Sequence, residues 1–334
     1  MGNGAWSDRA YTAAATFRRR SGATDFGYSD DLRRRPTSQW KAHADLDPLG
    51  VGVRESRDSA EHPNSTPIAV FFDVTGSMGS VPRQMQAELS KLHGLLQRKG
   101  YAEDPQIMFG AIGDADTDYV PLQVGQFESD NRMDEQLRSI FLEGNGGGQM
   151  SESYELAAYF MARHTATDAW EKRGRKGYLF VIGDETCKPR LRAKHVRSIL
   201  GDRVGEDLDT AALWREVQER WEVFFVLPRQ TAHYDNPTVN QHWADLLGER
   251  LLRLDDPAAV CDLIALTVGL LEDSIDLDEG LDDLRDLGSA SGPSVGRALA
   301  TIGAPARTPA ARGATGRLPA TVASGLAADA DDLA

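Results

Sequence analysis

Cysteine is scarce in this sequence. Among 334 residues there are two, Cys187 and Cys261, and neither belongs to a Cys-x-x-Cys or Cys-x-x-His pattern. Two isolated cysteines supply neither a disulfide framework nor a cysteine-based zinc site. This usage is typical of a reducing compartment, so we expect a cytoplasmic protein.

Long apolar runs are also missing. The longest, residues 260–271, is about twelve residues long and contains Asp262, whereas a membrane-spanning helix needs about 20 apolar residues. The arginines at 18–20 are followed by Ser, Gly, Ala, Thr and Asp, and not by the apolar segment of a secretory or twin-arginine signal. The sequence therefore predicts neither a membrane segment nor export.

Basic residues are outnumbered by acidic ones. The chain has 37 Lys and Arg against 51 Asp and Glu, which gives a net charge of −14 and a sequence pI near 5.0. This balance disfavours nucleic acid and anionic membranes as partners. The content of 41% hydrophobic and 26% charged residues is ordinary for a folded globular protein.

The two ends of the chain differ from its centre. Residues 1–66 contain two arginine triplets and no sustained periodicity, which predicts an Arg-rich extended arm on the main domain or, alternatively, a docking segment for an acidic partner. The arm would place five aromatic side chains on the main domain, those of Trp6, Tyr11, Phe17, Tyr28 and Trp40. Residues 273–288 have leucines at near-helical spacing among acids, which predicts an acidic amphipathic helix. Residues 289–334, rich in Ala, Gly and Pro, are predicted to be a disordered tail.

The central segment, residues 67–272, alternates apolar runs with helical patterns, which is typical of parallel strands joined by crossover helices. We expect strands at 68–74, 106–112, 178–182, 222–227 and 251–254, and helices at 81–98, 133–141, 151–163, 191–200, 211–220, 239–247 and 257–271. Residues 120–127 follow the second strand too closely for a crossover helix, so we expect an antiparallel edge strand there. The predicted fold is α/β: a Rossmann-like, doubly wound, mostly parallel sheet with one antiparallel edge strand and helices on both faces.

Chemistry-bearing residues follow the first of these strands. Asp73 ends the strand, and Thr75 and Ser77 come directly after it. In an extended chain the three side chains share a direction. One carboxylate and two hydroxyls are oxygen ligands of the kind that Mg²⁺ or Mn²⁺ prefers.

Two further segments can complete such a site. Asp184 follows the strand predicted at 178–182, and parallel strands open at the same edge of a sheet. A glycine-rich loop at 144–151 leads into a predicted helix. Two carboxylates at equivalent strand ends predict a shared cation, because an unpaired carboxylate is costly there.

These residues resemble the von Willebrand factor A-type domain of intracellular bacterial proteins, with its metal-ion-dependent adhesion site. The family motif Asp-x-Ser-x-Ser reads Asp73-Val-Thr75-Gly-Ser77 here, Met78-Gly79 follows it, and Asp184 corresponds to the aspartate that ends the family's fourth strand. The resemblance covers about residues 67–272. It implies a non-enzymatic protein-interaction module in which an acidic side chain of a partner completes a bound Mg²⁺, or Mn²⁺ or Ca²⁺. Relatives of this kind often work beside AAA+ ATPases or in stress and defence assemblies.

One position departs from the family pattern. Met150 stands where the family places a threonine, and a thioether is a poor magnesium ligand. Ser151 or the amide oxygen of Gln149 can replace that threonine, although Ser151 is equally well placed as the N-cap of the next helix.

Two alternatives therefore stay open. One is a metal-independent scaffold with a degenerate site. The other is a serine hydrolase in which Ser77 is followed by Asp184 and by His233 or His242. The loops at Asp114 and at His233 should lie at the same edge as the metal site; we interpret both as solvated, with a field-tuning or second-ion role for Asp114 left open.

Overall fold

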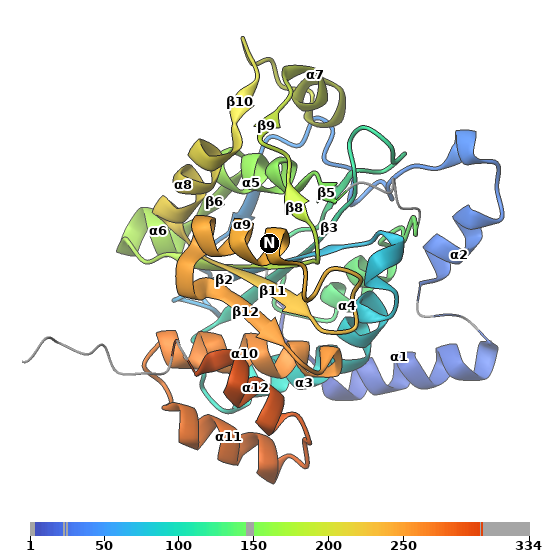
Figure 1. Ribbon diagram of the computed structural model, residues 1–334. Coiled ribbons are helices and arrows are strands. Elements are labelled where there is room, and N and C mark those ends of the chain that lie inside the picture. The colour runs from blue at the N-terminus through green and yellow to red at the C-terminus, as the bar shows by residue number, and fades with distance from the viewer. Residues whose placement is uncertain (1–3, 23, 25, 145–149, 301, 303–334) are drawn as a thin grey trace, which may run out of the picture. The chain divides into compact units, whose positions relative to one another are not determined.

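A six-stranded sheet forms the centre of the fold (Figure 1). The computed structural model describes residues 4–300 and 302 apart from residues 23, 25 and 145–149, and for residues 82 and 85–91 it describes the backbone. The strand order is β12-β11-β7-β2-β3-β4, with β4 antiparallel to β3 and the others parallel. The strands are β2 (Thr66–Asp73), β3 (Pro105–Ile112), β4 (Leu122–Val124), β7 (Gly177–Ile182), β11 (Trp221–Pro228) and β12 (Leu251–Leu254). The predicted doubly wound, mostly parallel sheet with an antiparallel edge is confirmed.

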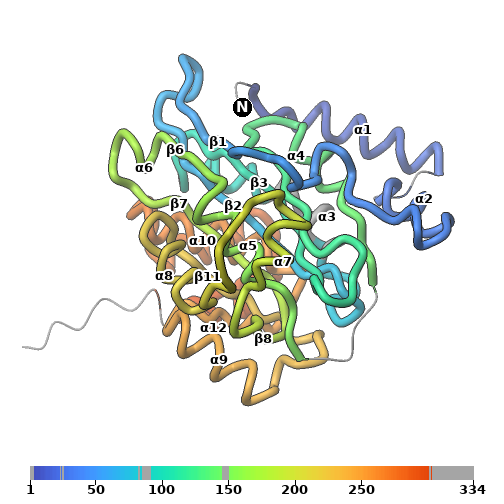
Figure 2. The backbone as a smooth tube through the Cα atoms, turned by 90° about the horizontal axis from the view of Figure 1, so that it is seen from above, coloured from blue at the N-terminus to red at the C-terminus, as the bar shows by residue number. Residues whose placement is uncertain are grey.

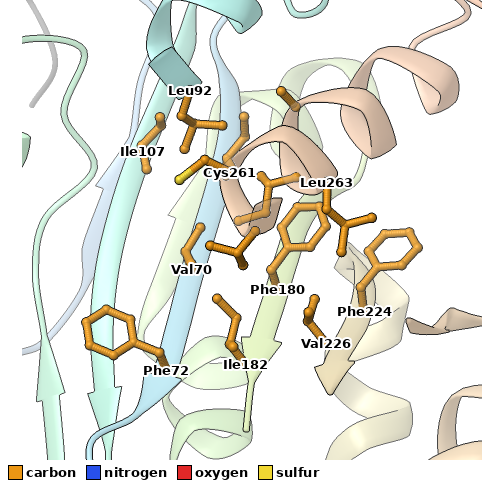
Figure 3. Close-up of a cluster of buried hydrophobic side chains, with 14 of the residues drawn as sticks. Val70, Phe72, Leu92, Ile107, Phe180, Ile182, Phe224, Val226, Cys261 and Leu263 are labelled. Carbon is orange, nitrogen blue, oxygen red and sulfur yellow. The ribbon is translucent and has the colours of Figure 1, made fainter. Parts of the chain in front are cut away.

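Helices cover both faces of the sheet because its central strands are apolar on both sides. Every residue of β2, β3 and β7 is buried, as expected for strands between two helical layers. Successive residues of β2 enter different cores, Val70 and Phe72 on one face and Ala69 and Phe71 on the other. Figure 3 shows the first core, where side chains of β2, β3, β7 and β11 meet Leu92 and Leu263.

The helices of the central segment begin and end close to the predicted positions, except α6, which was not predicted. α3 and α10 pack on the first core, and α5, α8 and α9 on the second. Their bounds are α3 (Val81–Arg98), α4 (Arg132–Arg138), α5 (Tyr154–Arg163), α6 (Asp168–Arg173), α7 (Ala193–His195), α8 (Thr210–Arg220), α9 (Pro237–Leu247) and α10 (Val260–Leu271). A π-helical turn, Val196–Leu200, continues α7.

Three two-stranded sheets flank the main one. β1 pairs with β6, β5 with β8, and β9 with β10. Their bounds are β1 (Arg54–Ser56), β5 (Ser151–Glu152), β6 (Thr165–Thr167), β8 (Thr186–Cys187), β9 (Arg190–Leu191) and β10 (Leu208–Asp209). The β5–β8 pair joins the end of the glycine-rich segment to the chain that follows β7.

Two helices form in the first half of the N-terminal segment, which was predicted to be extended. α1 (Asp8–Ser21) is capped by Ser7, whose Oγ accepts a hydrogen bond from the Ala10 N–H, and α2 (Gly27–Arg33) follows it. Trp6 stacks on His93 of α3. Figure 2 shows α1 and α2 on the side of the sheet that carries β3 and α4. The predicted aromatic packing holds for Trp6, Tyr11, Tyr28 and Trp40 but is wrong for Phe17, which is 72% exposed.

The C-terminal segment contains more structure than its composition suggests. The acidic helix is present as α11 (Leu277–Asp286), with a capping box between Asp276 and Glu279. The prediction of disorder from residue 289 is wrong for α12 (Gly292–Leu299). Val295 and Leu299, one helical turn apart, are fully buried in the first core and offset the ordering entropy of this short helix. The predicted tail from residue 303 onward lies outside the described residues.

No helix among the described residues is both long and apolar enough to cross a membrane.

Candidate metal site

Two buried carboxylates lie at one edge of the sheet. Asp73 is the last residue of β2, Asp184 lies two residues after the end of β7, and Phe72 pairs with Ile182 in the parallel ladder between these strands. Both aspartates are 0% exposed. The strand pairing therefore brings the two predicted acidic ligands together.

A tight turn adds the two hydroxyl groups. Residues 76–78 form a 3-10 turn instead of continuing the strand. The Ser77 Oγ donates to Asp184 Oδ1 at 2.9 Å and lies 3.0 Å from the Thr75 Oγ1, while the Thr75 N–H donates to Asp73 Oδ1 at 2.7 Å. The turn thus brings Asp73, Thr75, Ser77 and Asp184 together, where sequence reasoning relied on an extended chain.

Tyr154 completes the inner side of the site, and sequence reasoning missed it. It begins α5, is fully buried, and its hydroxyl donates to Asp73 Oδ2 at 3.1 Å. Gly183 makes room for this contact, because a Cβ there would overlap the Tyr154 hydroxyl. A buried tyrosine needs a partner for its hydroxyl, but no local motif in the sequence identifies that partner.

The loop after β11 reaches the same edge, as predicted from its position. The main-chain N–H of His233 donates to Asp184 Oδ2 at 3.2 Å. The contact uses the backbone, so the histidine ring itself is not needed to hold Asp184.

Acidic side chains gather at this edge, and their burial favours the protonated forms. Burial, followed by the nearby charge of Asp184, raises the pKa of Asp73 to about 7. Burial, followed by the charge of Asp73, raises the pKa of Glu185 to about 8 and the pKa of Glu152 well above its usual range. Among the described residues no basic side chain forms an ion pair with Asp73 or Asp184.

This donor set fits a hard divalent cation. It offers two carboxyl groups and two hydroxyls, and neither buried carboxyl group has a basic partner among the residues that the structure describes. In the described part of the chain, no three His, Cys, Asp or Glu side chains form a group that could hold a metal ion. Any cation bound here therefore depends on the hydroxyl oxygens of Thr75 and Ser77 as well.

Among the described residues of the glycine-rich segment, neither Met150 nor Ser151 forms a hydrogen bond to these four residues. The Met150 side chain is 45% exposed, and its sulfur accepts a hydrogen bond from the Asn236 Nδ2 at 3.2 Å. Ser151 lies in β5, and no described residue hydrogen-bonds to its hydroxyl. The N-cap of α5 is Ser153, so the predicted capping role of Ser151 is wrong. Gln149 lies outside the described residues.

Asp114 is buried next to a lysine, and its interpretation as part of a solvated loop is wrong. It is 2% exposed, the ammonium group of Lys188 contacts its carboxylate, and the same group lies 2.7 Å from Asp116 Oδ2. Burial opposes the charge of Lys188, but hydrogen bonds to Asp114 and Asp116 outweigh it and raise the lysine pKa. The ammonium group of Lys188 is thus the cation that neighbours Asp114, for which the sequence left open the binding of a second metal ion.

Replacing Lys188 with methionine should lower the free energy of unfolding by about 2 kcal/mol at neutral pH, because Asp114 and Asp116 lose their shared counter-ion in a poorly hydrated site. Urea unfolding monitored by circular dichroism measures this change. Lys194→Met is the matched control, since Lys194 is exposed and 3.8 Å from Asp116, and it should change stability by less than about 0.5 kcal/mol. Equal effects of the two variants would contradict the internal counter-ion role of Lys188.

The described residues do not form the serine–histidine contact that the hydrolase alternative requires. The Ser77 hydroxyl is bonded to Asp184 and Thr75, and among the described residues no histidine is bonded to it. His242 instead lies with its Nε2 2.9 Å from the Cys187 sulfur. Burial raises the pKa of the Cys187 thiol, which disfavours a reactive thiolate there.

Comparison with known proteins gives distant structural matches. No family model matches the chain, and no curated protein matches it. Among solved structures, the pilus adhesin SpaC from Lactobacillus rhamnosus GG in its open conformation is 8% identical with a TM-score of 0.44, covering 65% of this chain and 31% of that one. The proximal thread matrix protein 1 of the mussel byssus, in a structure with a zinc-occupied MIDAS motif, is 10% identical with a TM-score of 0.42, covering 64% of this chain and 48% of that one. A second crystal form of the mussel protein is 9% identical with a TM-score of 0.41, covering 61% and 47%. The matches span less than half the length of these proteins.

Proposed function

We propose that this protein is a metal-dependent protein-interaction module of the von Willebrand factor A type, acting in the cytoplasm. One observation carries the proposal: two fully buried carboxylates, Asp73 and Asp184, share a hydrogen-bonded cluster with the Thr75 and Ser77 hydroxyls and have no basic partner among the described residues. The order of the strands and the antiparallel edge strand agree with the resemblance seen in the sequence.

Asp73, Thr75, Ser77 and Asp184 would hold a divalent cation, with Mg²⁺ the first candidate and Mn²⁺ or Ca²⁺ as substitutes. When bound, the cation supplies a positive charge that attracts an acidic side chain of a protein partner. Ser77 is partly exposed whereas both aspartates are buried, so a partner would approach from the hydroxyl side. By the family resemblance, an AAA+ ATPase or a component of a stress or defence assembly is the proposed class of partner.

A metal-independent scaffold is the second candidate function. The observation that favours it is the Met150 side chain, which bonds to Asn236 and supplies no oxygen to the site. The two functions differ in their response to divalent cations.

A thermal-shift titration with Mg²⁺, Mn²⁺ and Ca²⁺ tests the proposal. We expect about 2.7 kcal/mol of added stability at about a hundred times the dissociation constant. Asp73→Ala should abolish this stabilisation because it removes a charged ligand. Met150→Thr should enlarge it if the threonine hydroxyl reaches the cation.

Asp58→Asn is the matched control for Asp73→Ala. Asp58 hydrogen-bonds to Ser65, directly before β2, at the opposite edge of the sheet, so its loss should leave the metal-induced shift unchanged. Equal stabilisation of wild type and Asp73→Ala by metal, or no stabilisation of wild type, would favour the metal-independent scaffold.

A further inference from the structure

The outer face of α1 carries an exposed phenylalanine next to arginines. Phe17 is 72% exposed, the highest value among the large apolar side chains of the described residues. Residues of α1 alone, between Asp8 and Arg20, line a hollow of about 630 Å³ that includes Phe17. Arg19 and Arg20 are exposed too, and neither forms an ion pair with a described residue. This face of α1 is therefore an apolar and basic surface, in a chain whose net charge is −14.

α11 offers the opposite combination of side chains. Leu287 follows the last residue of this helix and is 50% exposed. Glu279, Asp282 and Asp286 recur at spacings of three and four residues, so they share one face of the helix, and all three are exposed. Asp282 pairs with Arg285 of the same helix, but both side chains are exposed and such a pair contributes little. This face of α11 is therefore an apolar and acidic surface.

Both helices lie at the same end of the molecule, at the bottom of the view in Figure 1. Asp8 at the start of α1 pairs with Arg98, and Asp283 of α11 pairs with the next residue, Lys99. Arg98 is the last residue of α3, which has 18 residues and is therefore about 27 Å long. Ser77 of the candidate metal site lies before the first residue of α3. The two helix faces are therefore remote from the candidate metal site.

We propose that α1 of one copy of this protein docks on α11 of a second copy. The two faces are opposite in charge, and each has one large exposed apolar side chain, Phe17 or Leu287, to bury against the other. Because both helices lie at one end of the molecule, a two-fold axis forms the contact twice, with each copy supplying one α1 and one α11. The proposal does not depend on a bound cation.

A second copy fits these surfaces better than a nucleic acid does. A phosphate backbone that approached the arginines of α1 would also meet the acidic face of α11 at the same end of the molecule. Exposed ion pairs are individually weak, so we expect a dimer of micromolar affinity that depends on burial of Phe17 and Leu287. Such a dimer leaves both candidate metal sites open, so one dimer could bind a multivalent partner at two places.

Sedimentation velocity of the full chain, at micromolar to submillimolar concentrations, tests the proposal with two charge-reversal variants. The first is Arg19→Glu with Arg20→Glu, and the second is Asp282→Lys with Asp286→Lys. Each variant alone should dimerise at least about tenfold more weakly than wild type, because like charges then face each other in both contacts. An equal mixture of the two variants should dimerise again, because in the mixed dimer every contact joins an acidic face to a basic one.

Matched controls separate this contact from general effects of charge and apolar exposure. Phe17→Ser should also weaken dimerisation, whereas Leu49→Ser should leave it within about twofold of wild type, since Leu49 is 56% exposed but lies outside both helices. Arg34→Glu with Arg35→Glu removes the same number of exposed arginines beyond the end of α2, and it should likewise have less than about a twofold effect. Far-UV circular dichroism and thermal unfolding establish that each variant is folded.

Several results would overturn the proposal. Wild-type protein that stays monomeric at submillimolar concentration is one, and charge-reversal variants that dimerise as well as wild type are another. A mixture of the two folded variants that remains monomeric is a third, because the restored complementarity then has no effect. If a charge-reversal variant does not fold, the serine variants decide, and equal dimerisation of Phe17→Ser and Leu49→Ser would contradict the contact.

Discussion

Replacing Trp243 with alanine is expected to lower the free energy of unfolding by about 3–5 kcal/mol, the range for large aromatic residues in a packed core. Trp243 of α9 is fully buried, and its ring stacks on Phe225 with 3.8 Å between ring centroids. Its Nε1 donates to the main-chain oxygen of Glu185 at 2.8 Å. The substitution leaves both a cavity and an unpaired carbonyl group. Urea unfolding of wild type and variant measures the loss.

The same substitution should also weaken metal binding, because Trp243 packs against a residue that holds Asp73 in place. Its ring packs edge-on against Tyr154, whose hydroxyl holds Asp73. Phe224→Ala is the control: Phe224 is buried in the core on the opposite face of the sheet and stacks on Phe180. We expect both variants to be destabilised, with the metal-induced shift reduced only in Trp243→Ala. Equal metal-induced shifts in the two variants would contradict the supporting role of Trp243.

Much of the fold could be predicted because its signals are local. Buried strands of a parallel sheet are continuous apolar runs, and the runs ending at Asp73 and Ile182 appear in the structure as β2 and β7. The placement of Asp73 and Asp184 at one edge then follows from parallel pairing. The same reasoning predicts the edge position of the loop containing His233, which hydrogen-bonds to Asp184.

The errors arise where stability comes from distant contacts. α1 has a cap and a basic last turn, but its mean hydropathy is low, and Arg18 is anchored by Asp134 of α4. α12 lies in a segment whose composition favours disorder, and it is ordered by burying Val295 and Leu299. In both cases the residues that stabilise the helix belong to other elements, far away in the sequence. Local periodicity carries no information about such contacts.

The candidate site also contains some residues that the sequence identifies and others that it does not. Asp73, Thr75 and Ser77 form one short motif and could be identified directly. Tyr154 and Lys188 could not, because their contacts depend on where α5 begins and on the course of the chain directly after β8. The partly buried charge of Lys188 has no local sequence signature, since lysine is ordinarily a surface residue.

The stability of the metal-free protein should fall as the pH rises from about 4 to about 8. Burial and the charge of Asp184 raise the pKa of Asp73 to about 7, against about 3.9 in an unfolded chain. Between these values the folded state holds a proton that the unfolded state has released, so unfolding becomes more favourable as the pH increases. A difference of this size corresponds to about 4 kcal/mol for a fully buried carboxyl group. Glu185 and Glu152 act in the same direction.

A divalent cation should reverse this loss, because it occupies the site only after the protons leave. Its stabilising effect is therefore expected to be small near about pH 5 and largest near about pH 8. Urea unfolding at a series of pH values, with chelator and with Mg²⁺, measures both curves.

Asp73→Asn isolates the contribution of one carboxyl group, since asparagine keeps the shape and does not titrate. In chelator, this variant should lose less stability than wild type between about pH 4 and about pH 7, and Mg²⁺ should stabilise it little at any pH. Asp104→Asn serves as the control, because Asp104 bonds to the Asn64 N–H before β2, at the opposite edge of the sheet. If wild-type stability in chelator rises over this pH range, or if Asp73→Asn follows the wild-type curve, then Asp73 is ionised in the free protein. In that case the protein itself stabilises the ionised Asp73 carboxylate, and the argument that this carboxylate needs a bound cation fails.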